Sequence, residues 1–115
     1  MIVILMGMSA VGKDSVRRIL ERDYGYSNIV SYTSRGMRVG EEDGIDYHFV
    51  SKKEFEDMIR NNDMIEYRSY ETKLGGINDT WFYGIKKFEL DDSKDYVVVI
   101  DLVGAENIIN YFDYF

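Results

Sequence analysis

The sequence predicts an α/β fold with a parallel core sheet flanked by helices. Two apolar runs, Ile2–Met6 and Tyr96–Ile100, lack polar alternation, which is typical of strands buried on both faces of a parallel sheet. Apolar residues at helical spacing follow each run, as in a strand-helix alternation. With 115 residues and no proline, internal repeat or low-complexity tract, the chain forms one compact domain at most.

A glycine-bounded loop connects the first strand to the first helix. It consists of Gly7, Met8, Ser9, Ala10, Val11 and Gly12, followed by Lys13. The glycines let the backbone turn its N–H groups inward, while the lysine adds a mobile cation and the helix adds the positive end of its dipole. This pattern predicts a cradle for the phosphates of a nucleoside triphosphate, with an ordinary glycine turn as the alternative.

The residue after the lysine departs from the strict form of this pattern. A Ser or Thr is expected there, where its hydroxyl holds Mg²⁺, but the chain has Asp14 at that place and Ser15 next. Phosphates would repel an unshielded Asp14 carboxylate. We therefore expect Asp14 or Ser15 to approach a Mg²⁺ ion that accompanies the nucleotide.

The first helix is expected to run from Lys13 to about Arg22, with Gly25 ending the segment. Apolar residues at positions i, i+3 and i+4 form its buried stripe and are Val16, Ile19 and Leu20. The chain then continues with a short strand, a polar loop and another strand, at Ile29–Ser34, Gly36–Gly44 and Tyr47–Val50.

Ser51 and Glu54 have the spacing of a capping box and predict a second helix. Its inner face is expected to consist of Phe55, Met58 and Ile59. The segments that follow are expected to be a strand, a loop or hairpin end, an extended segment and a short helix, at Met64–Tyr70, Glu71–Thr80, Trp81–Gly84 and Ile85–Leu90. After the final strand, a last helical stripe consists of Ala105, Ile108, Ile109 and Phe112.

Charge is distributed unevenly along the chain. The net charge is −7, but residues 1–40 hold six Lys or Arg against three Asp or Glu, whereas residues 41–115 hold eight against eighteen. Positive charge thus gathers near the phosphate cradle, while the acidic remainder disfavours nucleic acid. The sequence contains no cysteine, no run long enough to span a bilayer and no signal before the first strand. We therefore expect a cytoplasmic protein that binds a free nucleotide, with neither nucleic acid nor membrane as a partner.

The segment Ser31–Val50 carries groups suited to a second, smaller phosphate. Arg35 and Arg38 lie three residues apart, Ser31 precedes them and Tyr47 follows a glycine-rich bend. Guanidinium forks bind phosphate oxygens bidentately, and hydroxyl groups add hydrogen bonds without charge conflict. A solvated basic loop is the alternative interpretation.

Two acidic residues, Glu66 and Asp101, lie at the ends of predicted strands. A carboxylate can accept from the ring N–H and the amino group of guanine together, a donor pair that adenine lacks on that edge. Because acids repel phosphate, these two are expected at the base end of a nucleotide. They could equally be surface acids in a chain rich in them.

With these motifs in place, the chain resembles the N-terminal part of a guanylate kinase, a P-loop nucleoside monophosphate kinase. The resemblance runs from Ile2 to about Ile109 and is most specific in Ser31–Val50, which contains Ser-x-Thr-x-Arg, Arg, Gly-Glu and Gly-x-Asp-Tyr-x-Phe in the family's order. It implies a P-loop kinase core over residues 1–30 and 94–115. Residues 31–93 would form a small mixed or antiparallel GMP-binding region. The implied reaction transfers the γ-phosphoryl group of Mg-ATP to GMP and gives ADP and GDP.

The resemblance also implies a role for each candidate residue. Residues 7–15 would bind ATP, and Asp14 and Ser15 would lie near Mg²⁺. The GMP phosphate would be held by Ser31, Arg35, Arg38, Tyr47 and Tyr83, and its guanine by Glu66 and Asp101. The catalytic cations would be Lys13, Arg35 and Arg38.

Several positions depart from the family pattern. Ile85 stands in place of a hydroxyl residue that touches guanine, Val99 replaces an expected acid, and the segment Glu71–Phe82 is longer than in familiar members. The family also continues past this chain with further core strands and an arginine-bearing lid. We therefore expect the chain as given to bind nucleotides better than it catalyses. We also expect it either to associate with a second copy through the edge of Ile2–Met6 or to aggregate.

Two other functions stay open. Kinases that phosphorylate ribose bisphosphate share the fold and can have Gly-Lys-Asp-Ser in the loop, as here. A non-catalytic nucleotide-binding domain is the other alternative, although such domains usually lose the phosphate loop that this chain keeps.

Overall fold

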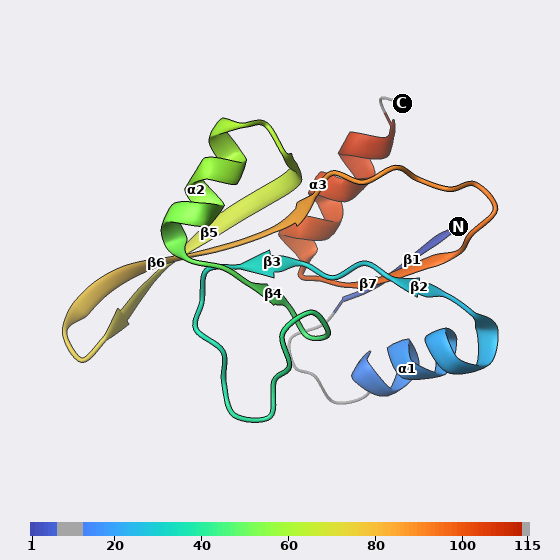
Figure 1. The fold of residues 1–115 in the computed structure, drawn as a ribbon, viewed down its shortest axis with the longest axis horizontal. Helices are drawn as coiled ribbons and strands as arrows, with labels where there is room; N and C mark the ends of the chain where they lie inside the picture. The colour runs from blue at the N-terminus through green and yellow to red at the C-terminus, as the bar shows by residue number, and fades with distance from the viewer. Residues whose placement is uncertain (7–12, 114–115) are drawn as a thin grey trace. The chain divides into compact units, whose positions relative to one another are not determined.

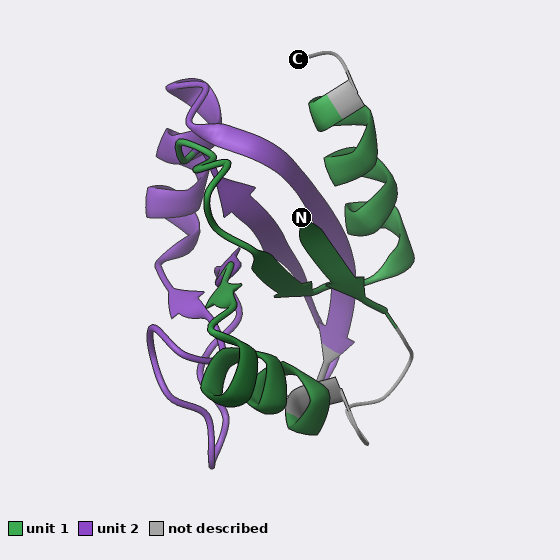
Figure 2. Cartoon of the chain, turned by 90° about the vertical axis from the view of Figure 1, so that its right-hand side faces the viewer, with its two compact units in different colours: residues 1–29, 88–115 green, residues 30–87 purple. Residues whose placement is uncertain are grey.

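The computed structural model describes residues 1–6 and 13–113, which form two compact units (Figures 1 and 2). Unit 1 comprises Met1–Ile29 and Phe88–Phe115, and unit 2 comprises Val30–Lys87. The loop Gly7–Gly12 lies outside the described residues. Among the helices described, none combines the length and the apolar character that crossing a membrane requires.

Unit 1 is a three-stranded parallel sheet with helices on both faces (Figures 1 and 2). Its elements are β1 (Ile2–Leu5), α1 (Lys13–Tyr24), β2 (Ser27–Asn28), β7 (Tyr96–Val99) and α3 (Leu102–Asp113). The strand order is β1-β7-β2, so β7 is central, and its Val97 and Val98 are fully buried. Both apolar runs therefore form strands of one parallel sheet, which confirms the α/β prediction.

Helix α1 ends as the sequence predicts but buries a different face. Gly25 adopts φ +70° after Tyr24, and the Tyr26 N–H bonds the Leu20 carbonyl at 3.0 Å, which is a glycine-based helix end. The expected stripe is wrong in part, because Val16 and Ile19 are 44% and 43% exposed, while Arg17 is buried. The three short strands described in unit 1 offer a narrow surface, so part of the apolar stripe stays uncovered.

Unit 2 is a mixed four-stranded sheet that carries one helix. Its elements are β3 (Tyr32–Thr33), β4 (His48–Phe49), α2 (Lys52–Arg60), β5 (Met64–Leu74) and β6 (Ile77–Lys86). The strand order is β4-β3-β6-β5, with β3 parallel to β4 and antiparallel to β6. Helix α2 packs on the sheet through Phe55, whose ring stacks on that of Phe82 with centroids 5.3 Å apart.

The capping box at the start of α2 is confirmed. The Ser51 hydroxyl accepts from the Glu54 N–H at 3.0 Å, and the Glu54 carboxylate accepts from the Ser51 N–H at 3.4 Å. Two otherwise unsatisfied donors of the first turn are thereby bonded. Phe55 is fully buried and Met58 and Ile59 are half-buried, as the helical spacing predicts.

Three strand boundaries differ from the sequence prediction. The expected strand Ile29–Ser34 is interrupted, because the chain leaves unit 1 for unit 2 between Ile29 and Val30. Of the two expectations for Glu71–Thr80, a hairpin end is confirmed and a loop is wrong, because β5 and β6 stay paired from Glu71 with Thr80 to Leu74 with Ile77. The expected helix Ile85–Leu90 is wrong, since Ile85 still pairs with Glu66 in the sheet.

The hairpin between β5 and β6 turns at Gly75 and Gly76. Their φ angles of +60° and +81° are those of a type I′ turn, in which both central residues have positive φ and glycine is favoured. At the other end of the hairpin, a register shift between Met64 and Glu66 marks a β-bulge or irregularity. This end contains Glu66, one of the two acids that the sequence singled out for the base.

Candidate functional site

The loop between β3 and β4 is the candidate site for the phosphate of the acceptor nucleotide, and hydrogen bonds of Thr33 fix where it begins. The Thr33 hydroxyl donates to the Phe82 carbonyl at 2.9 Å and accepts from the Arg35 N–H at 3.1 Å. Thr33 is fully buried, so these two bonds form away from solvent. They tie the first residue of the loop to the neighbouring strand β6 and fix where the Arg35 side chain begins.

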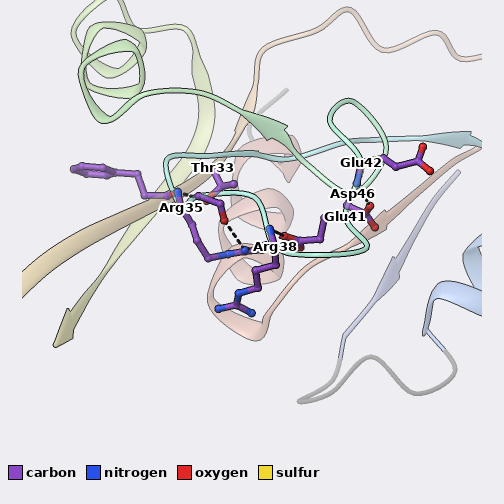
Figure 3. A network of polar contacts seen from close by, with 8 residues as sticks. Thr33, Arg35, Arg38, Glu41, Glu42 and Asp46 are labelled. Carbon is purple, nitrogen blue, oxygen red and sulfur yellow. Dashed lines mark hydrogen bonds and ion pairs between the residues drawn. The ribbon is translucent and has the colours of Figure 1, made fainter. Parts of the chain in front are cut away.

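Arg35 is held by a two-point contact with Glu41. Its guanidinium Nη1 and Nη2 donate to Glu41 Oε1 and Oε2 at 3.0 and 2.8 Å, and Nη1 also donates to the Gly36 carbonyl at 2.9 Å (Figure 3). Glu41 Oε1 accepts in addition from the Arg38 backbone N–H at 2.7 Å. The carboxylate thus closes the loop on itself and clamps the buried Arg35 in one orientation.

The electrostatics of this pair keep both partners ionised. The hydrogen bond to Glu41 raises the pKa of the Arg35 guanidinium, against an opposing effect of burial. In return, the hydrogen bond from Arg35 holds the pKa of the Glu41 carboxyl below its ordinary value. The pair therefore stays ionised, with the Arg35 guanidinium held in one orientation.

Two tyrosines lie against this cation. The Cζ atom of Arg35 is 5.4 Å from the ring centroid of Tyr47, and the rings of Tyr47 and Tyr83 meet edge to face with centroids 5.9 Å apart. Burial, followed by the field of Tyr83, raises the pKa of the Tyr47 hydroxyl, so that it stays a neutral donor. A guanidinium with two neighbouring phenols suits an anion that has several oxygens.

Arg38 differs from Arg35 in being exposed. Its Cζ atom is 5.9 Å from the ring centroid of Trp81 on β6. Trp81 lies in a segment that the sequence predicts to be extended, and nothing in its local pattern indicates a contact with an arginine. Arg38 thus makes a cation–π contact with Trp81 while its side chain stays exposed to solvent.

The acids that follow Glu41 bond the backbone of their own loop. The Asp46 carboxylate accepts from the Glu42 N–H at 2.7 Å (Figure 3), and the Asp43 carboxylate accepts from the Phe49 N–H at 2.9 Å. These contacts stabilise the bend that brings Tyr47 toward Arg35. The acidic run is therefore part of the loop structure.

Glu66 lies on β5 in a buried ion pair. Its side chain is 1% exposed, and Oε1 accepts from Arg68 Nη1 at 2.8 Å, with the Arg68 side chain 10% exposed. The Arg68 guanidinium also lies 5.7 Å from the ring centroid of Tyr83. Sequence reasoning missed Arg68, although residues two apart on a strand share a face and an acid beside an arginine is a readable signal.

Ser31 and Ile85 are buried members of the same unit. The Ser31 carbonyl accepts from the His48 N–H at 2.9 Å, which joins β3 to β4. Ile85 is 2% exposed and pairs with Glu66 across the β5–β6 ladder. Unit 2 thus contains Ser31, Arg35, Arg38, Tyr47, Glu66 and Tyr83.

The remaining candidates belong to unit 1. Asp101 directly precedes α3, and its carboxylate accepts from the Gly104 N–H at 2.9 Å, as in a helix cap. Lys13, Asp14 and Ser15 form the first residues of α1, and the Ser15 side chain is exposed. The side chains of Lys13 and Asp14 lie outside the description, as does the loop of Gly7, Met8, Ser9, Ala10, Val11 and Gly12.

Comparison with known proteins identifies one family. A family model described as guanylate kinase matches residues 1–103. Guanylate kinases from Latilactobacillus sakei and Enterococcus faecalis are 40% and 38% identical to this chain, each over 94% of the chain and 52% of the relative. A crystal structure of guanylate kinase from Anaplasma phagocytophilum aligns with a TM-score of 0.67 at 26% identity, over 98% of this chain and 54% of that one. The chain spans about half the length of the curated relatives it matches.

Proposed function

Because this chain belongs to the guanylate kinase family, we propose that it forms part of an enzyme that transfers the γ-phosphoryl group of Mg-ATP to GMP. The products are ADP and GDP. Residues 31–93 provide the GMP-binding region, and residues 1–30 and 94–115 contribute the ATP-binding core.

The observation that carries this proposal is the group of Arg35, Glu41, Tyr47 and Tyr83. A nucleoside monophosphate presents a small dianion, to which a guanidinium and neutral phenols can donate, and the charge of the Glu41 carboxylate is offset by its pairing with Arg35. Glu41 fixes the Arg35 side chain through two hydrogen bonds of 3.0 and 2.8 Å, so little freedom remains to be lost on binding. Arg38 on the same loop adds an exposed cation, and Ser31 a hydroxyl.

We assign the selection of guanine to Glu66 in unit 2, and the resemblance to guanylate kinases makes Asp101 in unit 1 a further candidate for this role. Guanine offers a ring N–H and an amino group on one edge, whereas adenine offers a ring acceptor beside its amino group. The buried setting of Glu66 strengthens such hydrogen bonds and makes a mismatched edge costly. This arrangement favours GMP over AMP as the acceptor.

The donor site is assigned to residues 7–15. Helix α1 begins at Lys13, so its N-terminal N–H groups and the positive end of its dipole fall at the phosphate loop. Asp14 and Ser15 in the first turn carry oxygen ligands of the kind Mg²⁺ prefers, so the donor set fits that ion. Bound Mg²⁺ supplies charge neutralisation at the β- and γ-phosphates, and Lys13 supplies a further cation to the same oxygens.

A ligand panel tests the acceptor. GMP, AMP, ribose 1,5-bisphosphate and ribose 5-phosphate are compared by thermal shift and calorimetric titration. GMP is expected to raise the melting temperature and AMP is not. Glu66→Ala is expected to weaken GMP about tenfold or more, because a hydrogen bond to a charged group contributes about 1.5–3 kcal/mol.

Turnover is followed in parallel by ADP release in the presence of each acceptor. Equal stabilisation by AMP and GMP would contradict the guanylate assignment. A response to ribose 1,5-bisphosphate alone would favour a sugar-phosphate kinase. Binding of GMP without ADP release by any longer version of the chain would indicate a non-catalytic nucleotide-binding domain.

A further inference from the structure

Arg68 is a buried cation to which the proposed reaction assigns no role. It lies on β5 beside Glu66, with Nη1 2.8 Å from Glu66 Oε1, and its guanidinium faces the ring of Tyr83. Its side chain is 10% exposed and that of Glu66 is 1% exposed. A charged pair at this depth costs desolvation, so a function at the site would explain why it is there.

The strand register puts Arg68 on the same face as Glu66, the residue proposed to recognise the base. Glu66 pairs with Ile85 and Arg68 pairs with Tyr83 across the β5–β6 ladder. Glu66 and Arg68 are two residues apart and share one face of β5. Ile85 is buried and apolar, so its side chain supplies no donor to a carbonyl group on a base near Glu66.

Guanine needs both kinds of partner along one edge. Its ring N–H and 2-amino group are donors, which suit the two oxygens of a carboxylate, while its C6 carbonyl is an acceptor. In that arrangement the carbonyl lies beside the carboxylate oxygen that accepts from the ring N–H. A guanidinium that is hydrogen-bonded to the same carboxylate can also donate to this carbonyl, because its five N–H groups point in fixed directions from one plane.

We propose that Arg68 determines the specificity of the acceptor site by donating to the C6 carbonyl of the base, so that the Glu66–Arg68 pair selects 6-oxopurine nucleotides. This inference rests on the proposed function. It assigns to Arg68 the carbonyl contact that Ile85 lacks the chemistry to make. It also adds a second element of discrimination against adenine, whose 6-amino group would face a like donor.

The test compares GMP with 6-thio-GMP, which keeps both donors but replaces the carbonyl oxygen with sulfur, a weaker acceptor. The wild-type chain and Arg68→Met are titrated calorimetrically with both nucleotides and with ribose 5-phosphate. Arg68→Met is expected to weaken GMP about tenfold or more and 6-thio-GMP much less, so that the ratio of the two affinities falls toward one. Ribose 5-phosphate is expected to bind equally well to both proteins.

Arg60→Met is the matched control, because Arg60 is an exposed arginine on α2 in the same unit that pairs with Asp57. It is expected to leave all three affinities unchanged. If Arg68→Met proves unstable, Glu66→Gln is compared with the double variant Glu66→Gln, Arg68→Met. The single variant is expected to keep the preference for GMP over 6-thio-GMP, and the double variant to lose it.

Each outcome decides between roles. Equal losses for GMP and 6-thio-GMP would overturn the proposal and leave Arg68 as a counter-charge for Glu66. Loss of ribose 5-phosphate as well would make Arg68 a phosphate ligand and would also overturn it. If the wild-type chain does not distinguish GMP from AMP, the proposed function itself fails, whereas an intact preference for GMP with an unchanged ratio refutes only the role of Arg68.

Discussion

Arg35 is a side chain whose conformation is preorganised for binding an anion. Arg35 donates two hydrogen bonds to Glu41 and one to the Gly36 carbonyl, and these bonds and the contact with Tyr47 restrict its long side chain to one conformation. An unrestrained arginine loses about 2 kcal/mol of rotamer entropy when it is ordered, and here folding has already met much of that cost. The residue that prepares the site is therefore Glu41.

Replacing Glu41 with Gln tests this preparation. The variant keeps a side chain of the same size but removes the charge, so the buried Arg35 loses its ionic partner. We expect the free energy of unfolding to fall by about 1–3 kcal/mol and GMP to bind more weakly. Denaturant unfolding and calorimetric titration measure the two effects. Glu42→Gln, at an exposed neighbour, is the control and is expected to change neither.

The same carboxyl group predicts an acid limit of stability. Its pKa is lower in the folded protein than its ordinary value, about 4.3, because Arg35 donates to the ionised form. The pair therefore stabilises the fold above that range, and the stabilisation is lost as the pH falls through the lower folded pKa. Unfolding followed from pH 6 to pH 3 is expected to show a shallower loss in Glu41→Gln than in the wild type. Parallel curves for the two proteins would refute this role.

The sequence singles out Arg35, Arg38, Tyr47 and Glu66 because their residue types suit a nucleotide, whereas Tyr83 is named only through the resemblance to guanylate kinases. It does not single out the partners that orient them. Glu41 reaches Arg35 only after the loop has closed, and its acidic neighbours look the same in the sequence. Trp81 meets Arg38 across two different elements, so no local pattern connects them.

The sequence predicted a loop or a hairpin end at Glu71–Thr80, and local patterns did not show that both strands of the β5–β6 hairpin continue through it. Most described side chains of this outer half are exposed, so the alternation of apolar and polar residues that indicates a strand is absent. Main-chain pairing and the Thr80 hydroxyl, which donates to Glu71 at 2.9 Å, hold the two strands together there. The turn itself was readable, because adjacent glycines meet the positive φ requirement of a type I′ turn.

Gly84 tests how closely β5 and β6 must approach. A Cβ atom there would lie 2.6 Å from the Glu66 carbonyl oxygen and 3.0 Å from the Tyr67 Cβ, so Gly84→Ala must push the strands apart. We expect a loss of about 1–3 kcal/mol in unfolding free energy and weaker GMP binding, since Glu66 moves with its strand. Gly36→Ala is the control, because nothing lies within 4 Å of its Cβ position. Equal stability of the two variants would contradict this account.

At the scale of the whole molecule, the sequence predicted the parallel sheet and its central strand well. Tyr96–Ile100 is apolar throughout because side chains on both faces of the central strand β7 are buried, as the successive residues Val97 and Val98 show. The first strand is different, since Ile2–Leu5 are half-buried and β1 lies at the edge of the described sheet. The pattern of apolar residues in the sequence therefore predicts the strands, but it does not predict how deeply each side chain is buried.

This edge predicts self-association of the 115-residue chain. One side of β1 pairs with β7, and no described strand pairs with the other side. Exposed strand edges that carry apolar residues pair readily with further chains. Light scattering over a concentration series is expected to show a dimer or larger species. A monodisperse monomer at every concentration would contradict the prediction.

The division of the chain also bears on the order of folding. Ile2 pairs with Tyr96, so all of unit 2 lies inside the loop that this pairing closes. Unit 2 is continuous, and the pairing of Tyr32 with Gly84 brings its own two ends together. Once that contact has formed, β1 and β7 are joined by a much shorter effective loop, and the entropy lost on closing it is smaller. Folding of the region proposed to bind GMP would thereby lower the entropy cost of pairing β1 with β7 in the core sheet.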